Sequence, residues 1–229
     1  FSQEDMDEAA ARGGTDWLGN VLRDGKIHNH SVSIGGGTEK VTYYFSGNYF
    51  NQTGTVENSE MQKYNGRADL SFQLTDWLKL STNIIANRNN FVNTVAGWQT
   101  GGAGANGFTA LQSALSYPTY LSIRDSNGEL TQFQLRGNPI GLLDIDDKTE
   151  YNSLYANFSL DFTIIPDKLK AKVLYGNNYE SSYRDFFIPS TTNWFDANQA
   201  RASLAWQKRQ QQTMETYATY NDNLTDFLN

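Results

Sequence analysis

Apolar and polar residues alternate along most of the chain after His28, and this two-residue period predicts β-strands. The stretch KVTYYFSGNYF places Val41, Tyr43 and Phe45 on one face and Lys40, Thr42 and Tyr44 on the other. The same alternation recurs in the stretches that begin near His28, Met61, Leu78, Tyr151, Leu169 and Gln212. The pattern predicts about seven strands, each with one mostly apolar and one mostly polar face.

Short turns and long loops alternate between these strands. Short turns are predicted at residues 35–40, 75–77, 166–168 and from Thr225 onward. Longer connections follow Asn51 and occupy residues 92–149 and 180–209. In an antiparallel meander this order places every short turn at one end of the sheet and every long loop at the other. We therefore divide the chain into residues 27–229, which form these strands and loops, and residues 1–26, which lead into them.

The leading residues 1–26 contain the one stretch with a helical pattern. Ser2 can cap a helix, acidic residues follow it, and Gly13 with Gly14 can end it. The segment lacks the basic start and apolar centre of a signal peptide, so we expect a mature or excised segment. A short amphipathic connector, TDWLGNVLR, joins the helix to the first strand.

The two faces of the predicted strands suit a membrane on one side and water on the other. The strands exceed the roughly 9 to 11 residues that a tilted strand needs to cross a bilayer. A basic side chain on the lipid-facing side would cost about 2 to 4 kcal/mol at mid-bilayer. The basic residues fall instead on the polar face: Arg67, Lys79, Lys170 and Lys172. Tyrosines that suit the membrane interfaces fall on the apolar face: Tyr43, Tyr49, Tyr64 and Tyr175. A soluble β-sandwich would show the same alternation, but with strands of typically about 5 to 6 residues.

Composition excludes several classes of protein. The 229 residues carry a formal net charge of −7 without a basic stripe, which argues against a nucleic-acid partner. The absence of cysteine excludes a disulfide framework and zinc-thiolate sites. No apolar stretch approaches the roughly 20 residues of a membrane-spanning helix.

The first ninety residues resemble a known family. The stretch NHSVSIGGGTEKVTYYFSGNYFNQTG combines an Asn-His pair, a Gly-Gly hairpin with Glu-Lys, a Tyr-Tyr strand and an Asn-Gln-x-Gly loop entry. This combination is similar to the barrel region of the SusC/RagA family of TonB-dependent outer-membrane transporters of Bacteroidota. The resemblance is good over residues 1–91 and thinner, mostly in strand pattern, to the end.

The resemblance implies an all-β fold, an antiparallel meander that forms a segment of a large transmembrane β-barrel with long extracellular loops. It also implies a location in the cell outer membrane and a role in importing glycans or peptides. The implied partners are a SusD-like surface lipoprotein, membrane lipid, and TonB acting through a plug that this sequence does not contain. About seven strands, an odd number, cannot close a single-chain bacterial barrel, so we expect a slice of a transporter that is open at both edges.

Aromatic residues in the polar loops are the candidate ligand-binding residues. They suit stacking on a sugar ring or docking of a partner protein, although they could instead pack the long loops against one another. The candidates are Trp98, Tyr183, Phe186, Trp194 and Phe195, with Phe187 beside them.

Metal and catalytic sites have weaker support. His28 and His30 share a strand face without an evident third ligand, and we interpret them as structural. A carboxylate cluster could hold calcium but lacks the spacing of an EF-hand, so a solvated acidic loop is preferred: Asp144, Asp146, Asp147 and Glu150. We predict no catalytic residue, metal or cofactor, and no enzyme. The alternatives are a soluble β-rich carbohydrate-binding or adhesin module and an extracellular enzyme fragment.

Overall fold

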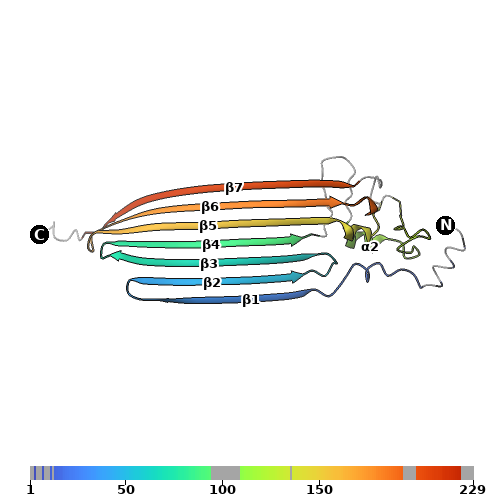
Figure 1. Ribbon diagram of the computed structural model, residues 1–229, viewed down its shortest axis with the longest axis horizontal. Helices are drawn as coiled ribbons and strands as arrows, with labels where there is room; N and C mark the ends of the chain where they lie inside the picture. Colours follow the sequence, from blue (N-terminus) through green and yellow to red (C-terminus); the bar gives the residue numbers. More distant parts are fainter. Residues whose placement is uncertain are drawn as a thin grey trace.

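Seven strands form a single antiparallel sheet in which each strand pairs with its neighbour in the sequence (Figure 1). The structure is a computed structural model, which describes residues 3, 7, 11, 13–93, 109–134, 136–192 and 200–222. The strands are β1 (Lys26–Gly37), β2 (Val41–Thr53), β3 (Glu60–Thr75), β4 (Leu78–Val92), β5 (Asp146–Ile165), β6 (Leu169–Ile188) and β7 (Arg201–Tyr220). The described ranges also contain the short helical elements α2 (Ala110–Ser116), η1 (Gly141–Asp144) and η2 (Ser190–Thr192).

The two ends of the sheet differ as the sequence predicts. The connections β1–β2, β3–β4 and β5–β6 are tight turns, and they lie together at one end, which we call the turn end (Figure 1). The connections β2–β3, β4–β5 and β6–β7 lie at the other end, the loop end, together with the connector that precedes β1. This separation confirms the predicted antiparallel meander.

The pairing register collects the alternating residues into continuous rows across the sheet. One such row runs through Tyr43, Leu70, Thr82, Phe158, Tyr175 and Met214. The next residue along each strand points to the opposite face, and these residues also form a row: Thr42, Ser71, Ser81, Ser159, Leu174 and Glu215. The sheet therefore has one apolar face, containing the first row, and one polar face, containing the second.

The strands extend further toward the loop end than the sequence pattern predicts. Residues 180–209 were expected to form a loop, yet β6 continues to Ile188 and β7 begins at Arg201. Likewise, β5 begins at Asp146, within the loop expected at residues 92–149. Near the loop end both faces carry polar residues, so the alternation disappears while the backbone hydrogen bonds continue.

The apolar face has no second layer of described chain packed upon it. Leu70, Phe72, Leu160 and Phe162 of this face are half-buried, as expected for side chains with neighbours only within one sheet. In a β-sandwich, the alternative considered from the sequence, a second sheet would bury these four side chains. No described residues cover them in this way. No helix in the described ranges is long and apolar enough to cross a membrane.

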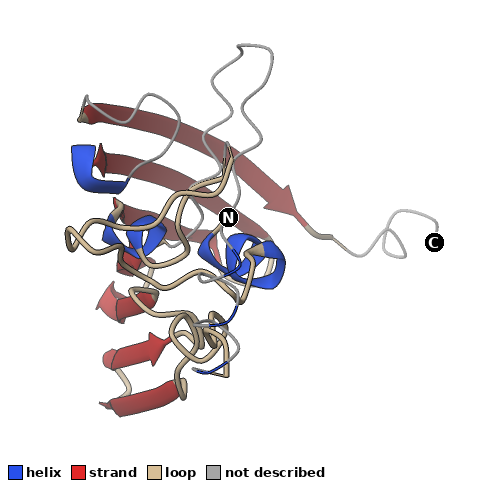
Figure 2. Ribbon diagram, turned by 90° about the vertical axis from the view of Figure 1, so that its right-hand side faces the viewer, coloured by secondary structure: helices blue, strands red, loops and turns tan. Residues whose placement is uncertain are grey.

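The hydrophobic core lies at the loop end rather than beside the strands. It combines the connector before β1, the α2 region, the segment around η1 and the end of β6. Its main members are Trp17, Val21, Ala110, Ala114, Tyr117, Leu121, Leu142, Leu143, Ile145, Phe186 and Ile188. Figure 2 shows these loops and helices gathered at the end of the strands. We call this unit, residues 13–24 with 109–145, the cap.

Helix α2 begins at a capping box. The hydroxyl of Thr109 accepts a hydrogen bond from the backbone N–H of Gln112, and the Gln112 side chain accepts one from the backbone N–H of Thr109. Two otherwise unpaired N–H groups are thus satisfied. In the leading segment, the described residues Gln3, Asp7 and Ala11 are helical, and the rest of the helix predicted there lies outside the described residues.

Candidate functional site

The apolar face carries a continuous band without charged side chains. Between the turn end and the middle of the sheet, the described residues of this face on β2 to β5 include no Asp, Glu, Lys or Arg. The band consists of Val41, Tyr43, Phe45, Gly47, Tyr49, Tyr64, Gly66, Ala68, Leu70, Phe72, Leu78, Leu80, Thr82, Ile84, Ala86, Leu154, Ala156, Phe158, Leu160 and Phe162. The predicted placement of Tyr43, Tyr49, Tyr64 and Tyr175 on this face is confirmed.

The edge of the apolar band crosses the strands obliquely. Its first polar residues toward the loop end are Asn51 and Gln62 on β2 and β3, Arg88 and Asn152 on β4 and β5, and Asn177 and Gln212 on β6 and β7. From β2 to β7 this edge shifts by three register rows, or six residues along the strand. Six residues span about 20 Å and five strand spacings about 24 Å. The edge therefore slopes by about 40°, which is the tilt of strands in transmembrane barrels.

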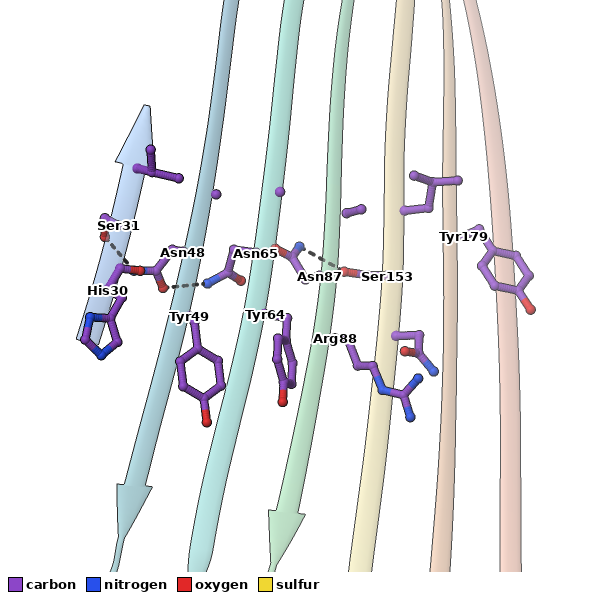
Figure 3. A pocket seen from close by; sticks show the side chains of 16 residues that line it. His30, Ser31, Asn48, Tyr49, Tyr64, Asn65, Asn87, Arg88, Ser153 and Tyr179 are labelled. Atoms are coloured by element: carbon purple, nitrogen blue, oxygen red, sulfur yellow. Dashed lines mark hydrogen bonds between the residues drawn. The ribbon is translucent and has the colours of Figure 1, made fainter. Parts of the chain in front are cut away.

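Aromatic rings mark part of the edge of the band. His30 stacks on Tyr49 with 6.5 Å between ring centroids, and the centroids of Tyr49 and Tyr64 are 5.1 Å apart. Figure 3 shows these rings side by side across β1, β2 and β3, followed by Arg88 on β4. Beside them the small residues Gly47, Gly66 and Ala86 leave a shallow groove of about 900 Å³. Such a row of amphipathic rings is typical of a membrane interface.

The polar face is joined by hydrogen bonds between side chains of neighbouring strands. The Asn48 amide donates to Asn29 at 2.7 Å and to Ser31 at 2.7 Å, and the Asn65 amide donates to Asn48 at 3.2 Å. On β4, Asn87 donates to Ser153 at 3.0 Å (Figure 3). Carboxamides and hydroxyls thus line this face from β1 to β5 and present both donors and acceptors.

Several charges of the polar face form ion pairs with one another. Arg67 donates to Asp69 at 2.6 Å, and Asn83 also donates to Asp69. Lys172 lies 3.2 Å from Asp161 on the neighbouring strand. The predicted placement of Arg67, Lys79, Lys170 and Lys172 on this face is confirmed by the register.

The cap packs against the polar face. The residues of β5 and β6 that are buried at the loop end all belong to that face: Asp147, Ser153, Phe186 and Ile188. Within the cap, the Trp17 indole donates to the Pro118 carbonyl at 2.9 Å and lies edge-on to Tyr117, with centroids 4.8 Å apart. The Asn58 amide donates to the Leu143 carbonyl at 2.7 Å and joins the β2–β3 connection to the cap. The cap therefore covers the loop end of the polar face.

The structure separates the aromatic residues that the sequence suggested as ligand-binding. Tyr183 and Phe186 occupy opposite faces of β6, Tyr183 exposed on the apolar face and Phe186 only 4% exposed in the cap core. Phe187 shares the face of Tyr183. Trp98, Trp194 and Phe195 lie outside the described residues. For Phe186, burial favours the loop-packing alternative; the ligand-binding roles of the other residues stay predictions.

The carboxylates considered for calcium do not converge. Asp147 pairs with Arg184, Asp146 with Lys148 at 2.9 Å, and Glu150 with Arg88. Asp146 and Asp147 point to opposite faces of β5. In the described part of the chain, no three metal-ligating side chains form a group.

One exposed aromatic residue was not among the candidates predicted from the sequence. Trp206 lies on the apolar face of β7, directly opposite Tyr183 in the register. It stood within a region predicted to be a loop, although the alternation SLAWQKRQ could have placed it on a strand.

These features define the class of protein. The chain forms an antiparallel sheet of the kind that makes up a segment of a large transmembrane β-barrel, with one apolar face, one polar face and long loops at one end. The sheet is not closed, since β1 and β7 are both edges.

Comparison with known proteins specifies the class further, although no model of a known protein family matches the sequence. TonB-dependent receptor P3 of Formosa agariphila is 28% identical over 211 residues, which cover 90% of this chain and 21% of that protein. TonB-dependent receptor P26 of the same organism is 47% identical over 64 residues, 28% of this chain and 6% of that protein.

Solved structures share the fold. The RagAB peptide importer in the "closed-closed" state has a TM-score of 0.68 and 19% sequence identity, covering 92% of this chain and 24% of that one. Its "open-open" state has a TM-score of 0.68, with 18% identity over 90% of this chain. The chain thus spans about a fifth to a quarter of the length of the first of these relatives and of the importer chains. Over that part, the resemblance to TonB-dependent transporters of the SusC/RagA type is confirmed.

Proposed function

We propose that this chain is one wall of an outer-membrane barrel that imports nutrients with energy delivered by TonB. The observation that carries the proposal is the asymmetry of the sheet. One face has a band free of charge, whose edge slopes at the tilt of a membrane barrel, and the other face has a hydrogen-bonded polar surface that the outer loops cover. A water-soluble sheet with such an uncharged band would cover it with a second layer, and the described residues place none there.

The cargo that fits the polar face is a peptide or an oligosaccharide. Carboxamides and hydroxyls such as Asn48, Asn65 and Ser153 can exchange hydrogen bonds with either. The structural neighbours are described as peptide importers, which supports a peptide, whereas the aromatic residues of the loops suit sugars. We also propose a SusD-like surface lipoprotein as the partner at the loop end and a TonB-contacting plug inside the barrel. The receptor names of the relatives support transport rather than catalysis.

Cysteine labelling along β5 tests the orientation of this wall. The chain contains no cysteine, so single cysteines at positions 154–162 can be introduced into the full-length barrel in intact outer membranes. A water-soluble maleimide should label positions 157, 159 and 161, whose side chains face the interior. Lipid should protect positions 154, 158 and 160, which a lipid-soluble quencher should reach instead.

Two outcomes would overturn this proposal. If both sets of positions react equally with the water-soluble reagent, the apolar face does not contact lipid. If the chain alone remains monomeric in water without detergent, the soluble carbohydrate-binding or adhesin module replaces the barrel wall. Growth of a deletion strain on peptides or on glycans as the sole carbon source then separates the two kinds of cargo.

A further inference from the structure

Two exposed aromatic side chains lie opposite each other on the apolar face near the loop end. Tyr183 of β6 pairs in register with Trp206 of β7. Tyr183 is 44% exposed although it has neighbouring strands on both sides, and Trp206 is 71% exposed on the edge strand β7, where the open edge adds to its exposure. Leu204 and Phe187 of the same face are also exposed beside them. We call Tyr183, Trp206, Leu204 and Phe187 the outward platform. Exposed aromatic residues gathered in this way mark an interaction site.

The outward platform lies beyond the edge of the apolar band, toward the loop end. On β6 and β7 the first polar residues of this face are Asn177 and Gln212, each six residues from Tyr183 and Trp206, respectively. Six residues of a strand tilted by about 40° rise about 15 Å. The headgroup region of a phospholipid bilayer adds only about 5 to 8 Å on each side of the hydrocarbon. Neither acyl chains nor simple headgroups therefore explain exposed rings at this height.

Charged and polar groups border the rings directly. Glu150 and Asp185 occupy neighbouring register positions on the same face, and Lys208 is next to the platform, with its Nζ 5.1 Å from the ring centroid of Tyr179. Protein–protein interfaces are depleted of charge at their aromatic centres. A pyranose ring, in contrast, presents an apolar C–H face together with a rim of hydroxyls. Such a ring can stack its C–H face on the aromatic rings while its hydroxyls form hydrogen bonds with the charged residues around them.

We propose that the outward platform binds the saccharide headgroup of an outer-leaflet glycolipid. The platform lies on the same face as the apolar band and directly beyond its edge. A ligand whose acyl chains contact that band therefore carries its sugars to the level of Tyr183 and Trp206. The indole of Trp206 and the phenol of Tyr183 stack on the sugar rings, and Glu150, Asp185 and Lys208 bind their hydroxyls.

This inference rests on the proposed barrel function, because that function places the apolar face toward the membrane. It concerns a separate surface, however. Cargo passes along the polar face, whereas the outward platform is on the opposite side of the same strands. A lipid bound there lies on the outer surface of the transporter and is not imported.

Binding of defined glycolipids by the full-length barrel tests the inference. The probes are mixed micelles of an outer-membrane glycolipid with its core oligosaccharide, the same lipid after acid removal of that oligosaccharide, and the free oligosaccharide. Trp206→Ala and Tyr183→Ala are compared with the wild type and with Tyr217→Ala, an exposed aromatic residue on the polar face of β7. The cysteine-labelling pattern on β5 verifies that each variant is assembled.

We expect the intact glycolipid to bind the wild type, with each platform variant weakening its Kd by about tenfold, equivalent to about 1.4 kcal/mol. Tyr217→Ala should leave this Kd unchanged, the lipid without sugars should bind all proteins alike and weakly, and the free oligosaccharide should show the same ranking as the intact lipid. Equal binding of both lipids, or platform variants that bind like the wild type, would overturn the inference. So would loss of the partner lipoprotein with unchanged glycolipid binding, because the platform would then be a protein interface. A barrel that fails the labelling test refutes the proposed function instead.

Discussion

Arg184 donates two hydrogen bonds to the carboxylate of Asp147, at 2.8 Å from Nε and 2.7 Å from Nη2. Both side chains belong to the polar face, where the cap meets β5 and β6. Their environments differ, since Asp147 is 1% exposed while about half of the Arg184 side chain reaches solvent. The pair therefore joins β5 to β6 at the place where these strands meet the cap.

This difference predicts that the two single substitutions are unequal. Arg184→Ala leaves a buried carboxylate unpaired and should destabilise the loop end of β5 and β6, on which the cap packs, by about 3 to 5 kcal/mol. Asp147→Asn leaves an arginine that water can still solvate and should cost about 1 to 3 kcal/mol. The rate of proteolysis within residues 109–145 of the assembled barrel measures the effect. Equal rates for the two variants would contradict the conclusion that the carboxylate of this pair is buried and the guanidinium is not.

A charge placed in the apolar band should oppose insertion into lipid. Phe158→Arg puts a guanidinium near the middle of the band and should cost about 2 to 4 kcal/mol. Ser159→Arg, one residue further on β5, points to the polar face and serves as the matched control. Urea titrations of folding into lipid bilayers compare the two free energies. A control variant as unstable as Phe158→Arg would show that the faces are assigned wrongly.

Trp17 should be essential for attaching the connector to the cap. Its side chain is 2% exposed, packs on Tyr117 and hydrogen-bonds to Pro118. Trp17→Ala should destabilise the cap by about 3 to 5 kcal/mol through the cavity that it leaves. Trp17→Phe keeps most of the ring and should cost less. Trp77→Ala removes an exposed tryptophan at the turn end and should leave proteolysis of the cap unchanged.

Tyr117 should make cap stability depend on alkaline pH. Burial raises the pKa of Tyr117 to about 12, whereas the phenol has a pKa of about 10 in an unfolded chain. The folded cap thus retains the proton between these values, and its stability, complete below about pH 10, falls as the pH rises toward 12. Proteolysis of the cap between pH 9 and 12 should accelerate accordingly. Tyr117→Phe lacks the ionisable group and should flatten this dependence, while losing the hydrogen bond to the Thr131 carbonyl.

The sequence allowed the strands and their faces to be predicted where one side of the sheet is apolar and the other polar. Residues such as Leu70, Phe158 and Val173 recur every second position there, because a polar residue on that face is costly. Ile85 and Leu174 are apolar residues that break this alternation, and the register places both on the polar face. Each has polar neighbours across the strands, such as Arg67 opposite Ile85 and Ser159 opposite Leu174.

The loop end could not be predicted in the same way. Beyond the apolar band both faces carry polar residues, so β6 and β7 continue without alternation and were expected to be loops. The core of the cap joins Trp17, Leu142 and Phe186 from three distant segments, and no local period reveals that they meet. For the same reason Phe186 resembled an exposed loop aromatic, and Trp206 was not considered.

The position of the cap has a mechanical consequence. Hydrogen bonds and packing in the cap join the connector before β1, the β2–β3 connection and the end of β6. The cap therefore links the first strands of the sheet to β6 across its polar face. This link should fix the curvature of the sheet at the loop end. At the turn end the described residues join neighbouring strands through tight turns alone, and we expect the sheet to flex more easily there. Breathing of this wall is therefore expected to be greatest on the side away from the arriving cargo.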